Sequence, residues 1–195
     1  MSDLNAAIEA LGKGEIIVIT GDRFRRGDID FAIAAKHITA DAINFMARHG
    51  RGLICLSLTP ARAVKLGISL INPGSERQSG RPFGRSIEAR ADVTTGISAA
   101  DRAKTVEVAV AEGANSDDLV SPGHVFPLIA AQGGVAERPA AAEASIELCR
   151  LAGCGDTAVI CSIMRDDGEM ARLNDISELI ARFDLKVADI DDLLT

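Results

Sequence analysis

The stretch Ser121-Pro122-Gly123-His124-Val125-Phe126-Pro127-Leu128 joins a tight polar corner to an apolar run. Pro122 and Gly123 are typical turn residues, and the apolar residues after them predict a strand over 125–130. The corner places His124 just before this strand, where an imidazole that titrates near neutral pH can move a proton. The stretch therefore predicts an element of the sheet and a candidate catalytic residue.

Strand and helix signals alternate on both sides of this stretch, which predicts an α/β (α+β) fold. Thr39, Thr59 and Ser98 are expected to cap helices, the last in a capping box with Asp101. The chain shows no internal repeat and no linker, so residues 1–195 are expected to form one domain. The expected strands cover 15–19, 53–58, 125–130, 157–164 and 185–188, and the expected helices include 3–11, 140–151, 171–183 and 189–194.

The composition excludes several classes of protein. An apolar fraction of 47% and a net charge of -7 are typical of a folded globular chain and not of a disordered one. The acidic pI of about 5.0 argues against a nucleic-acid partner, and no apolar run reaches the roughly 18 residues of a membrane span. The N-terminus lacks a signal-peptide pattern, and the four cysteines lack metal-ligand spacing. We therefore expect a cytoplasmic protein with reduced, buried thiols and no membrane partner.

Several blocks in fixed order carry a resemblance to a known family. They are Arg48-His49-Gly50, Leu53-Ile54-Cys55-Leu56, residues 94–102, Pro122 to Leu128, and residues 166–172. With them the chain resembles the 3,4-dihydroxy-2-butanone 4-phosphate synthase family, from about Glu15 to the C-terminus. The resemblance implies a sandwich fold and a homodimer with sites at the subunit interface. It also implies a Mg²⁺-dependent conversion of ribulose 5-phosphate to dihydroxybutanone phosphate and formate.

Two positions that the resemblance assigns to metal ligands carry other residues. The family's first acidic loop corresponds to residues 24–30, where Arg26 takes the place of a metal-binding glutamate. Its second motif corresponds to residues 138–143, where Ala141 takes the place of the other metal-binding residue. Arginine is always cationic and alanine has no lone pair, so neither can ligate Mg²⁺. We therefore expect no metal and no other cofactor.

The resemblance also assigns roles to other residues. His124 matches an essential histidine, Arg25 and Asp30 match substrate contacts, and Ser162 stands where the family has an essential glutamate. Each assignment has a structural alternative: the arginines can be solvated charges, Thr94 and Thr95 can serve a turn, and Cys55 can be a core residue. The candidate catalytic residues are His124, Asp30 and Cys55, and the candidate ligand-binding residues are Arg25, Arg26, Arg51, Thr94, Thr95, Arg138 and Ser162.

Four of these arginines, Arg25, Arg26, Arg51 and Arg138, predict a metal-free positive pocket for a small anion. The leading hypothesis is a divergent homologue that binds a pentose-phosphate-like or other small anionic metabolite. Its chemistry would be that of an altered, metal-independent lyase or isomerase. The alternative is a non-catalytic, regulatory or stabilising homodimer of a riboflavin-related pathway, and the third hypothesis is retained synthase activity. The basic, glycine-rich loop 72–85 is either surface or a cover for the ligand.

Overall fold

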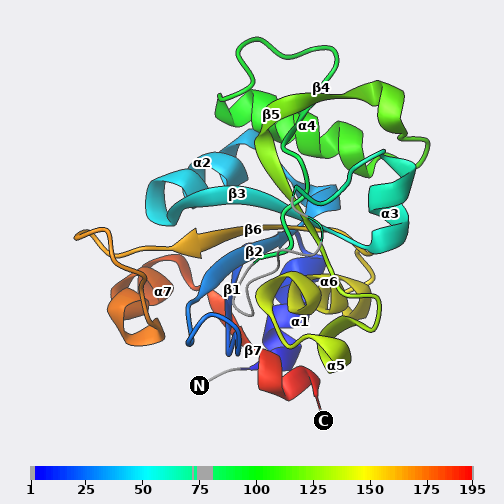
Figure 1. Ribbon diagram of the computed structural model, residues 1–195. Helices are drawn as coiled ribbons and strands as arrows, with labels where there is room; N and C mark the ends of the chain where they lie inside the picture. The colour runs from blue at the N-terminus through cyan, green and yellow to red at the C-terminus, as the bar shows by residue number, and fades with distance from the viewer. Residues whose placement is uncertain (1–2, 72, 74–80, 195) are drawn as a thin grey trace.

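The centre of the molecule is a mixed sheet (Figure 1). The computed structural model describes residues 3–71, 73 and 81–194, and within them seven strands pair in the order β4-β5-β3-β6-β2-β1-β7. The pairs β3–β5 and β1–β7 are parallel, and the other neighbours are antiparallel. The strands are β1 (Ile17–Thr20), β2 (Asp30–Ala34), β3 (Arg51–Leu58), β4 (Ile87–Ala89), β5 (Leu119–Ile129), β6 (Ala158–Ile163) and β7 (Lys186–Asp189).

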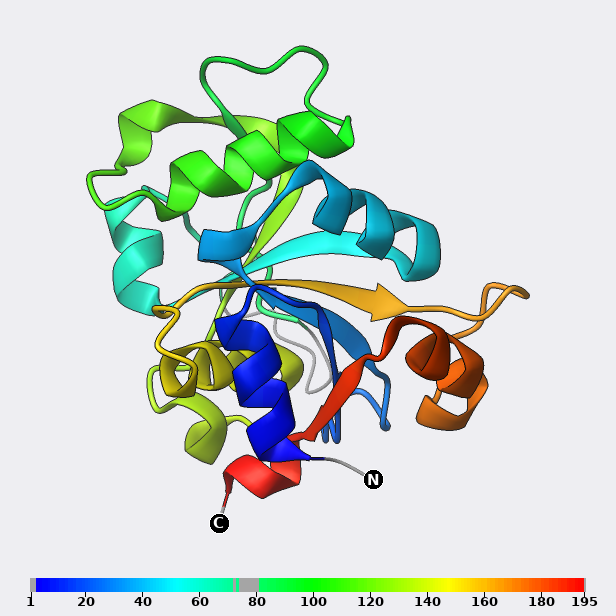
Figure 2. The ribbon, with the colours of Figure 1, turned by 180° about the vertical axis from the view of Figure 1, so that it is seen from behind.

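Two apolar cores lie on the two faces of this sheet. Successive side chains of a strand point to opposite faces, so Val18 of β1 joins one core while Ile17 and Ile19 join the other. The helices α2 (Ala40–His49) and α4 (Ala99–Val110) pack on the first core, and α1 (Leu4–Gly12) and α6 (Ala141–Leu151) pack on the second (Figure 2). This helix–sheet–helix arrangement confirms the mixed α/β fold expected from the sequence.

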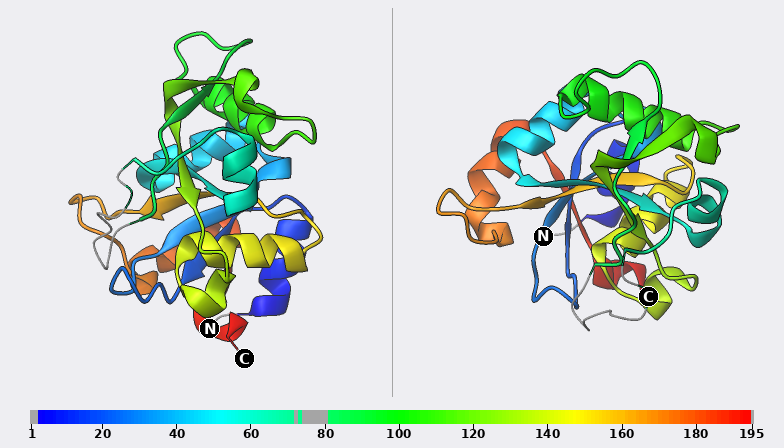
Figure 3. Two further views of the ribbon diagram at one scale, coloured as in Figure 1. Left: turned by 45° about the vertical axis from the view of Figure 1, so that its right-hand side comes forward. Right: turned by 45° about the horizontal axis from the view of Figure 1, so that its top comes forward.

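The first core extends to the edge of the sheet, where α4 lies over β4 and β5 and also packs against α2 (Figure 3). No helix in the described part of the chain is long and apolar enough to cross a membrane. The remaining helical segments are α3 (Pro60–Lys65), α5 (Gly134–Glu137) and α7 (Ser177–Phe183), with the 3₁₀ turns η1 (Ala35–His37), η2 (Ser116–Asp118), η3 (Leu173–Ile176) and η4 (Ile190–Leu193).

Side-chain caps fix where several helices begin. The hydroxyls of Thr39, Thr59 and Ser98 each accept a hydrogen bond from the backbone N–H three residues later, as the sequence predicts. The helix expected over 171–183 is instead divided into η3 and α7. The division follows from a local bond, because the carboxylate of Asp175 accepts the backbone N–H of Arg172 at 2.7 Å and fixes a 3₁₀ turn there.

Candidate functional site

The two segments in which the metal-ligand positions were expected lie side by side. Asp22 is buried, and its carboxylate accepts the backbone N–H of Ala141 at 3.1 Å and that of Phe24 at 2.9 Å. The backbone N–H of Arg23 donates to the carbonyl of Pro139 at 3.3 Å. Ala141 is the first residue of α6, where the backbone N–H groups have no partner within the helix. The carboxylate of Asp22 accepts one of these N–H groups. The loop between β1 and β2 is thereby fixed against the start of α6.

Asp30 is the centre of a cluster of charges at the start of β2. Its side chain is fully buried and faces Ser162, its register partner on β6. Arg25 Nη1 donates to Oδ2 of Asp30 at 2.6 Å, and Arg81 Nη2 donates to Oδ1 at 2.5 Å. Burial alone would raise the pKa of Asp30, but the guanidinium groups of Arg81 and Arg25 and the hydroxyl of Ser162 hold that pKa below its usual value. Asp30 is therefore an ionised, buried carboxylate.

Further hydrogen bonds extend this cluster. Ser162 Oγ donates to Oδ1 of Asp30 at 2.8 Å and accepts from Arg25 at 3.1 Å and Arg81 at 2.7 Å. Arg25 also donates to Asp28 at 3.1 Å, and Asp28 accepts a second bond from Arg172 at 2.6 Å. The members of the cluster come from four separate parts of the chain, so tertiary structure alone brings them together. We call Arg25, Asp28, Asp30, Arg81, Ser162 and Arg172 the Asp30 cluster.

Cys55 lies beside the Asp30 cluster on β3. Its side chain is fully buried, and Arg81 Nη1 lies 3.7 Å from its sulfur. Burial raises the pKa of Cys55 to about 11, and the nearby charge of Arg81 offsets this only in part. The residue is thus a neutral thiol at physiological pH. In this state it can pack against a ligand or donate a weak hydrogen bond, whereas a nucleophilic role would require a thiolate.

The structure does not bring the four predicted arginines into one pocket. Only Arg25 belongs to the Asp30 cluster. Arg26 is exposed and makes no hydrogen bond or ion pair with the described residues, and Arg51 pairs with Asp166. Arg138 lies over the ring of Phe24, with its guanidinium carbon 5.1 Å from the ring centroid. Arg81 was not among the predicted site residues, although it lies in the predicted loop 72–85, of which residues 72 and 74–80 are outside the described part of the chain.

A second cluster surrounds His124 at the edge of the sheet. His124 Nδ1 lies 2.7 Å from Oε2 of Glu88 on β4. Gly123 allows this contact, because a Cβ at that position would lie 2.2 Å from the backbone carbon of Ile87. Within the described residues, no hydrogen bond or ion pair connects His124 to Asp30. We call His124, Glu88 and the neighbouring loop 94–96 the His124 cluster.

The loop with Thr94 and Thr95 is held by Asp101 from α4. The Asp101 carboxylate accepts from the hydroxyl of Thr94 at 2.9 Å and from the backbone N–H of Gly96 at 3.0 Å. The predicted capping box therefore forms only in part. The carboxylate of Asp101 binds this loop and does not accept the backbone N–H of Ser98. Thr94 thus serves a turn, one of the two roles expected for it, and the exposed Thr95 makes no hydrogen bond with the described residues.

The residues near the expected metal positions do not fit a Mg²⁺ ion. Both carboxylate oxygens of Asp30 already accept hydrogen bonds, Arg26 brings a positive charge, and Ala141 offers only a methyl group. Among residues 3–71, 73 and 81–194, no three His, Cys, Asp or Glu side chains lie close enough together to form a metal site. No step of the chemistry below is therefore assigned to a metal.

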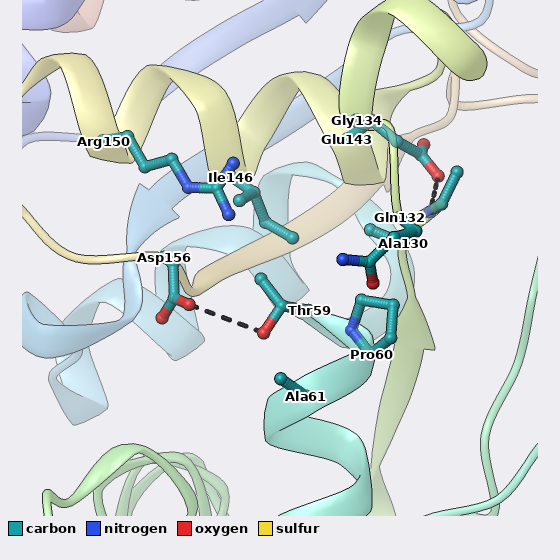
Figure 4. Close-up of a pocket in the computed structure, with 11 residues that line it drawn as sticks. Thr59, Pro60, Ala61, Ala130, Gln132, Gly134, Glu143, Ile146, Arg150 and Asp156 are labelled. Carbon is teal, nitrogen blue, oxygen red and sulfur yellow. Dashed lines mark hydrogen bonds between the residues drawn. The ribbon is translucent and has the colours of Figure 1, made fainter.

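A separate pocket lies beyond the C-terminal end of β3 (Figure 4). It encloses about 180 Å³, and none of the candidate site residues lines it. Thr59 and Asp156 face each other there with a hydrogen bond of 3.5 Å. Burial raises the pKa of Glu143, which also lines the pocket, and one of its carboxylate oxygens has no hydrogen-bond partner among the described residues. The pocket is lined by Thr59, Pro60, Ala61, Ala130, Ala131, Gln132, Gly134, Glu143, Ile146, Arg150 and Asp156.

Known proteins resemble the chain over almost its whole length. The family model described as 3,4-dihydroxy-2-butanone 4-phosphate synthase matches residues 5–195. The riboflavin biosynthesis protein RibBA of Aquifex aeolicus is 46% identical over 190 residues, which are 96% of this chain and 47% of that protein. The 3,4-dihydroxy-2-butanone 4-phosphate synthase of Pseudomonas aeruginosa is 40% identical over 194 residues, or 100% of this chain and 53% of the relative. The chain thus spans about half the length of these curated relatives.

Solved structures extend the comparison to the fold. A 3,4-dihydroxy-2-butanone 4-phosphate synthase in complex with two magnesium ions has a TM-score of 0.92 and 36% identity, and the match covers 99% of this chain and 95% of that one. RibBX, a two-domain 3,4-dihydroxy-2-butanone 4-phosphate synthase from A. baumannii, has a TM-score of 0.92 and 38% identity, over 99% of this chain and 57% of that one.

Proposed function

The chain belongs to the 3,4-dihydroxy-2-butanone 4-phosphate synthase family, and on that premise we propose that it binds a phosphorylated ketose of the ribulose 5-phosphate type. We propose further that it converts this ketose by the synthase reaction for which the family is named, as a step of riboflavin biosynthesis. One observation carries the proposal: Arg25, Asp30, Cys55 and Ser162, four of the residues to which the resemblance pointed, lie together around one buried carboxylate. The high identity to curated synthases supports the reaction.

Each cluster has a distinct task in this proposal. The ionised Asp30 holds the guanidinium groups of Arg25 and Arg81 in place. Positive charge fixed in advance stabilises the negative charge that develops on an enediolate oxygen. His124 is the titratable group that moves a proton, and Glu88 holds its ring.

We propose a homodimer as the state in which these two clusters meet. Within one chain, no hydrogen bond or ion pair joins the described residues of the His124 cluster to the Asp30 cluster. Leu53 near the start of β3 and Ile97 beside the 94–96 loop are half exposed, which is consistent with a further protein surface covering them. Mixing inactive Asp30→Asn with inactive His124→Ala protein is expected to restore turnover, because a mixed dimer would have one intact site. Failure of complementation between two folded variants would contradict a shared site.

A second function is favoured by a specific observation. Arg26 and Ala141 stand at the expected metal positions, and Ser162 stands where the resemblance places an acid/base glutamate. These replacements favour an altered lyase or isomerase reaction that requires no divalent cation, and they also leave room for a non-catalytic role. The synthase reaction and the altered reaction share a small anionic ligand.

One product assay separates these functions. Ribulose 5-phosphate is mixed with the protein in Mg²⁺ or in EDTA, and NMR follows formate and any other product. Formate formation is expected if the synthase reaction is retained, whereas a different product would indicate altered chemistry. No turnover and no binding of the sugar phosphate would overturn the proposal.

Two histidine variants serve as a matched pair in this assay. His124→Ala is expected to lower kcat by about 10²- to 10⁴-fold, the usual contribution of a general acid or base. His49→Ala removes a histidine that packs at a tilt against Phe45 and Phe183 and belongs to neither cluster, and it is expected to leave kcat unchanged. Equal turnover in wild type and His124→Ala would exclude the proton-transfer role.

A further inference from the structure

Arg81 reaches the Asp30 cluster from a segment that is anchored to β5. The backbone N–H of Ile129 donates to the carbonyl of Pro82 at 3.0 Å, and that of Gly84 donates to Pro127 at 2.9 Å. The ring of Phe83 packs on that of Phe126, with the centroids 6.3 Å apart. These contacts fix the backbone next to Arg81. Its side chain is consequently delivered to the cluster by the fold and is not a freely moving surface arginine.

The guanidinium of Arg81 is charged and partly accessible. Burial would lower its pKa, but the carboxylate of Asp30 raises it, so the group stays cationic at every physiological pH. Its side chain keeps 14% exposure, while that of Asp30 keeps only 1%. A ligand entering the site can therefore reach Arg81 more readily than Asp30.

Arg81 has hydrogen-bond donors to spare. A guanidinium has five N–H donors, and three are used here by Asp30, Ser162 and Cys55. The Nε–H and one N–H on Nη1 have no partner among the described residues. Arg25 likewise uses three of its donors, on Asp28, Asp30 and Ser162. The unused donors of Arg81 are thus available to a ligand oxygen.

The carboxylates of the cluster are already engaged by guanidinium groups. Arg25, Arg81 and Arg172 pair with Asp28 and Asp30, and the buried Asp22 also raises the pKa of Arg81. The free N–H donors of such a site can bind an anionic oxygen, whereas no carboxylate oxygen of Asp30 is left for a divalent cation.

We propose that Arg81 contacts the anionic or developing anionic oxygen of the ligand directly, and that with Arg25 it gives the site its positive charge without a divalent cation. This inference rests on the proposed function for the identity of the ligand. It differs from that function in what it predicts, because it assigns a role to one residue and makes binding independent of Mg²⁺.

The test is a binding titration of ribulose 5-phosphate in EDTA, followed by calorimetry. Arg81→Gln is expected to weaken binding by about 10- to 100-fold, the usual effect of losing a charged hydrogen bond. The matched control is Arg85→Gln, which removes the same charge from an exposed position four residues away and is expected to change nothing. Unchanged affinity in folded Arg81→Gln would overturn the assignment of Arg81 and would leave the proposed function intact.

A conservative variant covers the case in which Arg81→Gln fails to fold. Arg81→Lys keeps a positive charge beside Asp30 but loses the planar fork of donors, so it should fold and bind several-fold more weakly than wild type. The inference would be contradicted if Arg81→Lys bound ribulose 5-phosphate with wild-type affinity. It would also be contradicted if binding by the wild-type protein required Mg²⁺. Absence of binding by wild type both in Mg²⁺ and in EDTA would overturn the proposed function, and this inference with it.

Discussion

Ser162 and Asp30 face each other on the neighbouring strands β6 and β2, and the hydroxyl of Ser162 donates a 2.8 Å hydrogen bond to the buried carboxylate of Asp30. The small side chain leaves room beside Asp30 for the guanidinium of Arg81, which contacts both residues. A carboxylate at position 162 would instead place two negative charges side by side. The serine and the arginine are therefore complementary parts of one arrangement.

Removal of the Asp30 charge is expected to be strongly destabilising. Asp30→Asn leaves two largely buried guanidinium groups without their shared carboxylate, and breaking a buried ion pair typically costs about 3 kcal/mol or more. The free energy of unfolding from urea titrations measures this. Asp191→Asn is the control, because its pair with Arg23 is exposed and should contribute less than about 1 kcal/mol. Similar losses in the two variants would contradict the central position of Asp30.

The ionised carboxylate of Asp30 also predicts how the free energy of unfolding depends on pH. The folded-state pKa of Asp30 is depressed, so its contribution to stability is complete above the unfolded pKa of about 4 and is lost as pH falls through the folded value. Wild-type protein should lose stability over this acidic range, and Asp30→Asn should lose less over the same range. Parallel pH profiles for the two proteins would contradict an ionised Asp30.

The contribution of Glu143 to stability is expected to depend on pH in the opposite sense to that of Asp30. Its folded-state pKa is raised by burial, so its contribution to stability is complete below the unfolded pKa of about 4 and is lost as pH rises through the folded value. Glu143→Gln, which stays neutral, should therefore gain stability relative to wild type as pH rises from acid to neutral. Urea unfolding at a series of pH values measures this difference. A constant difference across the range would show that the pKa of Glu143 is not raised.

The close approach of Gly123, within β5, to β4 predicts a steric effect. Gly123→Ala would place a methyl group 2.2 Å from backbone atoms of Ile87, and backbone cannot move aside without shifting β4. A cost of about 2 kcal/mol is expected for overpacking at this position, together with loss of the His124–Glu88 contact. Gly113→Ala is the control, because nothing lies within 4 Å of the added methyl group. Thermal unfolding measures both variants, and equal melting temperatures would contradict the close approach.

The sequence predicted the fold best where local chemistry decides the structure. Thr39, Thr59 and Ser98 begin helices because each cap is made within three residues. β2 was not predicted, because Asp30, Ala32 and Ala34 have low strand propensity, and β4 is only three residues long. Both strands exist through pairing with distant segments, which short-range patterns do not reveal.

The candidate site was likewise predicted only in part. Arg25, Asp30, Cys55 and Ser162 were predicted, and the structure places them together. Arg81 was missed because its contact with Asp30 joins residues 51 apart in the chain. No spacing rule connects two such positions. Arg26 and Arg51 were predicted for the pocket, yet the first is exposed and the second is paired with Asp166.

The most direct test of this account is the affinity of the wild-type protein for ribulose 5-phosphate, measured by calorimetry in Mg²⁺ and in EDTA. A site whose positive charge comes from Arg25 and Arg81 predicts the same dissociation constant under both conditions. Binding that requires Mg²⁺ would contradict the account and would show that the chain holds a metal by groups other than those described for the Asp30 cluster.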